Sequence, residues 1–263
     1  MGIDVEEAAA TRALTEEQLN EFREQGFLRI GKILDDQAIN LLRVQYDHEF
    51  ELARSGKKGF RNLAIDDGGE LDDKNQADQQ MLQIMQMCER NIHFRELLYN
   101  KTILDIIEDL LGPNIQLFHD QAFYKPAGNG SPVFWHQDNG YWRCTPANLI
   151  SCWITLDDVT IENGAMQLIP GSHFRVQKHE RSSQTNALFD NKDKIDSSKA
   201  VVVDLPAGGA MIHHCQTFHY TGPNTSQQQR RAFAIHFMTP GTRLLKTGKE
   251  MPVSFKRPML RMG

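Results

Sequence analysis

Cysteine is scarce in this chain, which excludes a fold held together by disulfides. The 263 residues contain four cysteines, and no two of them form a Cys-x-x-Cys pair. Four thiols are too few to staple a domain of this length, and they suit a reducing, cytosol-like compartment. We therefore expect small, buried, reduced side chains at Cys88, Cys144, Cys152 and Cys215.

Long apolar runs and concentrated positive charge are also missing. No apolar stretch approaches the ~20 residues that a membrane-spanning helix needs, and the acidic start of the chain lacks the pattern of a signal peptide. The net charge is -5, and the basic residues form no stripe interleaved with aromatic ones. These absences predict a cytoplasmic protein with neither a membrane nor a nucleic-acid partner, and they say nothing about its oligomeric state.

The length and composition predict one large domain over residues 1–263. With 40% hydrophobic and 24% charged residues, the chain has enough apolar material for one substantial core. The pattern of apolar, turn-forming and charged residues changes twice along the chain. These changes divide it into a mainly helical part at 1–114, a strand-rich part at 115–240 and a basic tail at 241–263.

Caps and apolar spacing predict three helices in the first part. Residues 15–18 (Thr-Glu-Glu-Gln) have the pattern of a capping box, and Gly26 ends the helix that they open, ahead of a strand at 27–30. A third helix runs from 102 to 111. A second helix, which Asp35 or Asp36 could cap, is indicated by apolar residues at helical spacing, namely Ile39, Leu42, Tyr46 and Phe50.

Eight short strands are predicted in the second part. They are separated by turns rich in glycine, proline and asparagine, which is typical of an all-β barrel or sandwich. The fold class that we expect is mostly β with flanking helices, built around a double-stranded β-helix, the cupin-like jelly roll. Two polar segments, 61–80 with its acidic loop at 66–73, and 177–199, are open as candidate lids. The strands fall at 116–124, 132–136, 149–156, 165–169, 199–205, 209–213, 217–220 and 232–238.

The residues with the clearest chemical pattern are His136 and Asp138. On an extended segment, side chains two residues apart point to the same face, so an imidazole and a carboxylate converge. His219 is the third ligand that we favour, with His213 and His214 as alternatives. Two histidines and a carboxylate leave half of an octahedron open, as in non-haem Fe(II) oxygenases.

The spacing from His219 to the next arginines favours a bound dicarboxylate. Eleven residues separate His219 from Arg230, enough for a turn and a return on a neighbouring strand. The planar guanidinium binds a carboxylate bidentately, which suits the distal carboxylate of 2-oxoglutarate when its other end chelates iron. By pattern alone Arg231 is an equal candidate, but only one of two adjacent strand residues points inward.

These motifs together resemble the phytanoyl-CoA dioxygenase family of iron and 2-oxoglutarate oxygenases, over about residues 15–240. The shared pattern comprises Trp-His-Gln-Asp at 135–138, Trp153, Glu-Asn-Gly-Ala at 162–165, Ile-Pro-Gly-Ser-His at 169–173, Gly-Gly at 208–209, Phe-His at 218–219, Gly-Pro-Asn at 222–224, Arg-Arg-Ala at 230–232 and His-Phe at 236–237. The resemblance implies a structural turn at His173. It also implies an upstream basic residue that contacts 2-oxoglutarate, which we do not place.

The resemblance assigns roles to individual residues. It implies that the iron ligands are His136, Asp138 and His219, and that Arg230 rather than Arg231 holds the co-substrate. A hydroxyl near the same carboxylate is implied at Thr221, and pocket residues are implied at Gln137, Trp153 and Gln121. Candidates for the substrate pocket follow the metal motif directly: Asn139, Tyr141, Trp142 and Arg143. The Tyr-Trp pair among them could equally well belong to the core.

The implied activity is the hydroxylation of a small organic molecule with Fe(II), 2-oxoglutarate and O2, releasing succinate and CO2. Desaturation, epoxidation or cyclisation use the same ligands and stay open. Halogenation is disfavoured because Asp138 stands where halogenases have a small residue. Two rivals differ in class: a jelly-roll binding protein without activity, and a hydrolase with a zinc-bound hydroxide.

Overall fold

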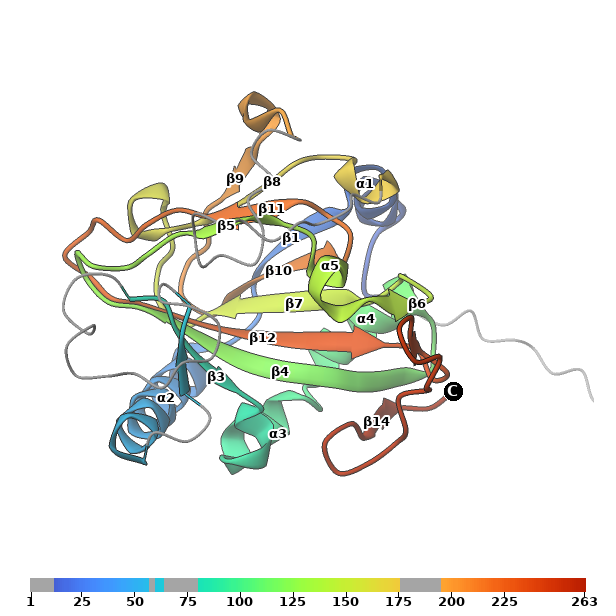
Figure 1. The fold of residues 1–263 in the computed structure, drawn as a ribbon, viewed down its shortest axis with the longest axis horizontal. Helices are drawn as coiled ribbons and strands as arrows, with labels where there is room; N and C mark the ends of the chain where they lie inside the picture. The colour runs from blue at the N-terminus through green and yellow to red at the C-terminus, as the bar shows by residue number, and fades with distance from the viewer. Residues whose placement is uncertain (1–11, 57–59, 64–79, 176–194) are drawn as a thin grey trace, which may run out of the picture.

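The computed structural model describes residues 12–56, 60–63, 80–175 and 195–263 (Figure 1). The acidic loop predicted at 66–73 lies outside these residues. So does most of each candidate lid, at 61–80 and 177–199.

Two antiparallel sheets form the body of the protein, which confirms the predicted jelly-roll class (Figure 1). The larger sheet has the order β1 (Phe27–Lys32), β10 (Gly209–His214), β7 (Ile150–Thr155), β12 (Arg230–Met238), β4 (Ile115–Lys125), β3 (Leu82–Met85) and β2 (Phe60–Asn62), with β14 (Met259–Arg261) also paired to β4. The smaller sheet has the order β5 (Val133–His136), β11 (His219–Thr221), β8 (Met166–Leu168) and β9 (Val201–Val203). A separate pair joins β13 (Arg243–Leu244) to β6 (Cys144–Thr145).

The helices α2 (Asp36–Gly56), α3 (Ile92–Leu97) and α4 (Lys101–Leu111) cover the face of the larger sheet that points away from the smaller one (Figure 1). The helix α1 (Glu16–Gln25) precedes β1, and Leu19 and Phe22 of α1 join the same apolar core. The carbonyl of Gln25 at its end accepts a hydrogen bond from the N–H of Gly171, which follows β8. One further helix, α5 (Asp138–Trp142), follows β5, and 3-10 turns occur at Met87–Glu89, Ile161–Asn163, Ser172–Phe174 and Ser197–Lys199. Among the helices described, none has the length and apolarity to cross a bilayer.

The predicted helix ends are confirmed at atomic detail. Thr15 accepts a hydrogen bond from the backbone of Gln18, whose side chain accepts one from the backbone of Thr15. Gly26 ends α1 in the left-handed conformation, with φ 81. Asp35 accepts from the backbone N–H of Ala38, so Asp35 rather than Asp36 caps α2.

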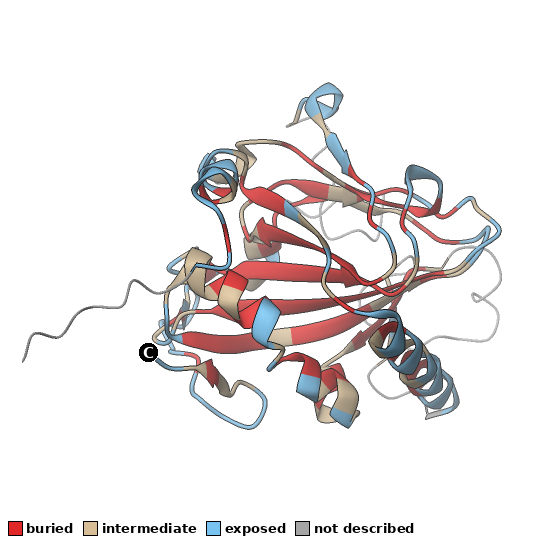
Figure 2. Ribbon diagram, turned by 180° about the vertical axis from the view of Figure 1, so that it is seen from behind, coloured by how far each residue is buried: buried red, intermediate tan, exposed pale blue. Residues whose placement is uncertain are grey.

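Strand alternation separates two cores on the two faces of the larger sheet. The central strands of this sheet are buried along most of their length (Figure 2). In β12, Phe233 and Ile235 belong to the core under the helices, whereas Ala232 and Ala234 belong to the core between the sheets. The strand is therefore buried on both faces, and its even-numbered residues point toward the smaller sheet. This parity decides which polar side chains enter the space between the sheets.

The first and last parts of the chain contribute more to the fold than their composition indicates. Residues 1–114 hold three strands of the larger sheet, of which only β1 is predicted from sequence. The basic tail packs on the body: Leu260 is buried, and Arg261 pairs with Asp105 and Glu108 of α4.

Candidate metal centre

Three potential metal ligands meet between the sheets. His136 ends β5 and His219 begins β11, and the two residues are partners in the register of these strands. Asp138 lies beside them, with its Oδ1 3.6 Å from the Nε2 of each imidazole. The three ligand atoms lie within 4.8 Å of one another, and all three residues are buried. The structure thus brings together the three residues that the sequence pattern singled out.

The local backbone differs from the expected continuous strand. Asp138 is the first residue of α5 rather than part of an extended segment. Gln137 is still extended, with φ -110 and ψ 131, so the alternation holds for one residue and sends its side chain away from the ligands. Its amide nitrogen donates to the carbonyls of Arg175 and Gln216, which anchors the ligand segment. A contact of Gln137 with 2-oxoglutarate stays a prediction.

Backbone carbonyls set the orientation of both imidazoles. Nδ1 of His136 lies 2.7 Å from the carbonyl oxygen of Phe134, and Nδ1 of His219 lies 3.0 Å from that of Thr217. Because a carbonyl only accepts, each ring carries its proton on Nδ1 and presents the Nε2 lone pair to the centre. Burial, followed by the neighbouring His136, lowers the pKa of His219 well below its usual value, so this ring is neutral and able to bind a cation.

The carboxylate of Asp138 is held through its other oxygen. Oδ2 accepts a hydrogen bond from Oγ of Ser151 at 3.1 Å and lies 3.1 Å from Nε2 of His213. Oδ1 is thereby left facing the two imidazoles. His213, one of the alternative third ligands, contacts the ligand carboxylate instead of completing the group, and His214 lies against His173.

A chain of buried hydrogen bonds extends from Asp138 into the larger sheet. The amide of Gln83 donates to Oε1 of Gln121 at 2.5 Å, and the amide of Gln121 lies 2.8 Å from Nε2 of His236. An amide NH2 only donates, so His236 accepts on Nε2 and carries its proton on Nδ1, which lies 2.7 Å from Oγ of Ser151. The Ser151 hydroxyl then donates to Asp138. Each donor in this chain points toward the ligand carboxylate.

Replacing Ser151 with alanine is expected to weaken metal binding about 10-fold, because loss of a contact that orients a ligand typically costs 10- to 100-fold in affinity. Thr155→Val is the matched control: Thr155 lies on the same strand, but its hydroxyl donates to the carbonyl of Pro206. Titration of both variants with Co²⁺ by calorimetry measures the difference. Equal affinities in the two variants would show that the series of hydrogen bonds from Gln83 to Ser151 does not orient Asp138.

The donor set fits a ferrous ion with open positions. Two imidazoles and one carboxylate are a nitrogen and oxygen set, in contrast to the thiolates typical of structural zinc sites. All four cysteines are buried and free, and burial raises the pKa of Cys152 to about 12. In the parts of the chain that the structure describes, the ligand group has three members. An octahedral ion held by them keeps half of its positions for other molecules.

A buried guanidinium that has no carboxylate partner among the described residues lies at the start of β12. Arg230 is 1% exposed, its Nη1 donates to the carbonyl of Gly164 at 3.2 Å, and its Cζ lies 5.4 Å from the ring centre of Trp153. Its Nε and Nη2 have no hydrogen-bond partner among the described residues. Burial lowers the pKa of Arg230 to about 10, because the buried surroundings disfavour the charged form of the guanidinium. A bound carboxylate would satisfy both nitrogens at once.

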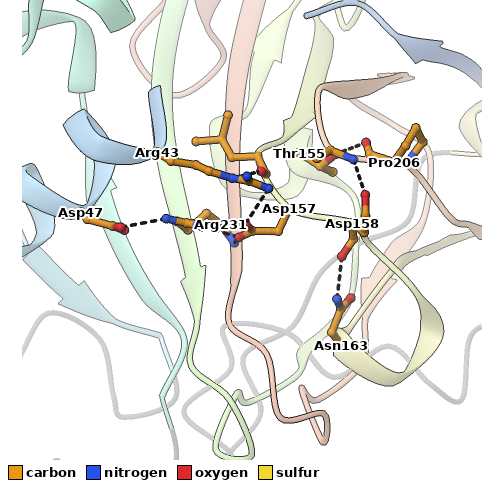
Figure 3. A network of polar contacts seen from close by, with 10 residues as sticks. Arg43, Asp47, Thr155, Asp157, Asp158, Asn163, Pro206 and Arg231 are labelled. Carbon is orange, nitrogen blue, oxygen red and sulfur yellow. Dashed lines mark hydrogen bonds and ion pairs between the residues drawn. The ribbon is translucent and has the colours of Figure 1, made fainter. Parts of the chain in front are cut away.

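Arg231 points to the opposite face of the sheet and is fully engaged there (Figure 3). Its Nη2 lies 2.7 Å from Oδ1 of Asp157 and its Nη1 lies 2.8 Å from Oδ2 of Asp47 on α2. Arg43 of α2 contacts the same Asp157. Period-two alternation therefore separates the two adjacent arginines, and Arg230 is the one that enters the space between the sheets.

Thr221 and Lys125 complete the surroundings of Arg230. Thr221 lies on β11, two residues after His219, and its hydroxyl oxygen accepts a hydrogen bond from Nζ of Lys125 at 2.9 Å. Lys125 is fully buried and is the register partner of Arg230. Sequence analysis missed Lys125, although a lysine at the inward-facing end of a long apolar strand is a signal that could have identified it.

The four substrate-pocket candidates have different surroundings. The amide of Asn139 is engaged with the backbone of Cys144, and the ring of Trp142 packs against Phe118, His119 and His236. Arg143 is exposed at the end of α5. Tyr141 alone of the four lies beside a ligand, with its ring 5.3 Å from that of His136.

A jelly roll that holds two histidines and a carboxylate between its sheets, beside an inward-facing arginine, defines the class of 2-oxoglutarate-dependent non-haem iron oxygenases. Solved structures of that class share the fold. The carbocyclase SnoK of nogalamycin biosynthesis matches with a TM-score of 0.75 at 22% identity, over 95% of this chain and 98% of that one. EvdO2 of Micromonospora carbonacea, complexed with 2-oxoglutarate, matches with a TM-score of 0.62 at 26% identity, over 91% of this chain and 95% of that one.

The sequence profile of the phytanoyl-CoA dioxygenase (PhyH) family matches residues 22–232, and the chain belongs to this family. The peroxisomal phytanoyl-CoA dioxygenase of Mus musculus is 28% identical over 235 residues, which cover 85% of this chain and 68% of the mouse protein. A probable alpha-ketoglutarate-dependent hypophosphite dioxygenase of Stutzerimonas stutzeri is 32% identical over 147 residues. That match covers 54% of this chain and 51% of the bacterial protein.

Proposed function

We propose that this protein hydroxylates a small organic molecule, using Fe(II) and O2 and converting 2-oxoglutarate to succinate and CO2. The observation that carries the proposal is the combination of an open three-ligand group with a buried arginine that lacks a carboxylate partner among the described residues. When bound, the iron would supply the oxidising chemistry that no side chain provides. The family fits this reading but does not select a substrate.

The residues of the chain have separate tasks in this proposal. His136, Asp138 and His219 would hold the metal, and Arg230 with Thr221 would hold the distal carboxylate of 2-oxoglutarate. Trp153, which belongs to the core between the sheets, lies against the guanidinium of Arg230. Placement decides which substrate carbon reacts, and Tyr141 beside His136 is the residue that we assign to the substrate side.

The proposal is tested by measuring succinate in anaerobic and aerated samples containing Fe(II), 2-oxoglutarate and a panel of candidate substrates. The panel includes acyl-CoA thioesters and hypophosphite, which the names of the relatives suggest. We expect succinate only in aerated samples, a stimulation by one substrate class, and none with His136→Ala. Turnover without oxygen would instead support a hydrolase, and activity surviving in His136→Ala would refute the ligand assignment.

The mass of the product separates hydroxylation from desaturation and cyclisation. Addition of one oxygen atom to the substrate is the expected result. Loss of two hydrogens would indicate desaturation or ring closure, which need the same ligands and differ in how the substrate is placed. If 2-oxoglutarate does not bind in the presence of metal, the result would instead support the alternative of a jelly-roll binding protein without activity.

A further inference from the structure

The basic tail holds one arginine that turns inward instead of pairing on the surface. Three other cations of the tail, Arg243, Lys256 and Arg261, pair with carboxylates. Arg257 is partly buried and has no carboxylate partner among the described residues. Its Nε is buried without a hydrogen-bond partner there, and its Cζ lies 5.8 Å from the ring centre of Phe118. An anion would satisfy this nitrogen and balance the charge of the guanidinium.

Hydrogen bonds to β4 hold the backbone at Arg257 in place. The carbonyl of Arg257 accepts from Nε2 of Gln116 at 3.1 Å, and the carbonyl of Pro258 accepts from the N–H of Leu117 at 3.0 Å. The residues that follow pair with β4 as β14. Figure 1 shows this segment at the end of the larger sheet where β12 ends, together with α5 and β6. Arg257 is therefore fixed at the end of the sheet that carries α5, the helix that Asp138 begins.

Arg230 and Arg257 lie toward opposite ends of the paired strands β4 and β12. Arg230 pairs in register with the last residue of β4, whereas Arg257 is held at Gln116, near the first. His236 of β12 lies between these ends and is linked to Asp138 by one serine hydroxyl. A 2-oxoglutarate that takes the Arg230 side leaves the Arg257 side for the molecule that is oxidised.

Aromatic rings connect Arg257 with the surroundings of the metal ligands. The ring of Phe118, against which the guanidinium lies, is 4.7 Å from that of His119 and 5.1 Å from that of Trp142, measured between centroids. His119 and Trp142 are in edge contact with each other at 5.5 Å, and both keep some accessible surface, as Arg257 does. These rings offer an apolar body a place to pack next to the cation.

His119 supplies a second unsatisfied group near Arg257. Its Nδ1 is buried and has no hydrogen-bond partner in the described part of the chain. Burial lowers the pKa of His119 to about 3, while the charges of Asp138 and Arg257 act on it in opposite directions. The imidazole is therefore neutral, with one N–H to donate, and it lies within reach of both the ligand carboxylate and the guanidinium.

The surface at this end of the sheet adds positive charge, although the whole chain has a net charge of -5. Arg143 is exposed where α5 ends, and its carbonyl accepts from the N–H of Leu245. Lys246 and Lys249, on the turn that follows β13, are exposed and have no carboxylate partner among the described residues. A local excess of positive charge raises the concentration of anions near the surface that carries it.

We infer that the substrate is a small organic oxyanion, a carboxylate or a phosphonate, whose charged group is bound by the guanidinium of Arg257 and whose apolar part packs on Phe118 and Trp142. The inference rests on the proposed function, in which 2-oxoglutarate occupies the Arg230 side. The planar fork of an arginine suits a bidentate oxyanion, which a lysine does not. Since Arg257 is not a metal ligand, a substrate held by its charged end presents a carbon of its remaining part to the metal.

The test uses three probes that share a phenyl ring: benzoate, phenylphosphonate and the uncharged benzamide. Calorimetric titration is made on protein loaded with Ni²⁺ and saturated with 2-oxoglutarate, so that Arg230 is occupied and no turnover occurs. We expect one or both anions to bind about 10- to 100-fold more tightly than benzamide, the range for hydrogen bonds to a charged group. In Arg257→Met this preference should disappear, whereas the binding of benzamide and of 2-oxoglutarate should not change. The two anions show whether the site takes a carboxylate or a phosphonate.

Two further variants keep the result specific. Lys256→Met removes a positive charge from the adjacent residue, whose ammonium pairs with Glu89, and should keep the preference for anions. Arg257→Lys keeps the charge without the planar fork and should keep part of the preference. If Arg257 only packs on Phe118, Arg257→Met lowers the melting temperature and leaves the preference intact. Arg257→Gln replaces Arg257→Met in the same comparison if the latter does not fold.

The outcomes separate this inference from the proposed function. Anions that bind no more tightly than benzamide, or do not bind, overturn the inference, and so does a preference that survives in Arg257→Met. If the Ni²⁺-loaded protein does not bind 2-oxoglutarate, the proposed function fails instead. The three probes are then titrated into Ni²⁺-loaded Arg230→Met protein with and without Arg257→Met, which tests the anion site by itself.

Discussion

Replacing His219 with alanine is expected to weaken metal binding by more than about 1000-fold and to abolish succinate release. Loss of an outer contact to a ligand already costs about 10- to 100-fold, and a ligand itself must cost more. The imidazole of His219 presents its Nε2 to the centre, and without it only His136 and Asp138 remain in the described ligand group. Co²⁺ affinity and succinate release, measured on folded protein, check this prediction.

The two neighbouring histidines provide matched controls. His213 contacts Oδ2 of Asp138, so His213→Asn should lower the affinity for Co²⁺ by about 10- to 100-fold. His214 lies outside the ligand group, with burial lowering its pKa to about 4, and His214→Ala should leave the affinity unchanged. A larger loss in the His213 variant than in the His219 variant would mean that the third ligand has been assigned wrongly.

The sequence predicted that His136, Asp138 and His219 lie together, because their pattern is local and chemical. His136 and Asp138 are two residues apart, and any extended or nearly extended backbone at Gln137 brings both toward one point. The eight predicted strands from residue 116 onward are all present, since turn residues and alternation mark them clearly. Alternation alone could not distinguish Arg230 from Arg231 until it was known which face of β12 points toward the smaller sheet; the family resemblance was what favoured Arg230.

The polar groups around the ligands were harder to predict, because each comes from a different strand. Ser151, His213 and His236 lie on β7, β10 and β12, and only the strand order places them at Asp138. Lys125 was missed for a related reason: it is paired with Arg230 across two strands that are far apart in sequence. The strands β2 and β3 were also missed, since the short run at 82–85 has too few residues to show a period.

Substituting Arg230 with methionine is expected to weaken 2-oxoglutarate binding by about 100- to 1000-fold without lowering the stability of the apoprotein. Two charge-assisted hydrogen bonds to one carboxylate, at about 1.5 to 3 kcal/mol each and not fully additive, account for this range. The apoprotein loses a buried cation that has no carboxylate partner among the described residues, so its folding does not depend on the charge. Metal affinity should be retained, because Arg230 is not part of the ligand group.

Arg231→Met, one residue away, should give the opposite result. Its guanidinium pairs with Asp157 and Asp47, and removing it leaves the largely buried Asp157 with Arg43 as its remaining ion-pair partner among the described residues, at a distance of 3.3 Å. We expect a loss of about 2 kcal/mol in the free energy of unfolding, below the range for a fully buried pair because Asp47 is half exposed. Binding of 2-oxoglutarate should not change. Chemical denaturation and calorimetric titration of the two variants therefore test the alternation in β12. If only Arg231→Met weakens 2-oxoglutarate binding, then Arg231 and not Arg230 holds the co-substrate.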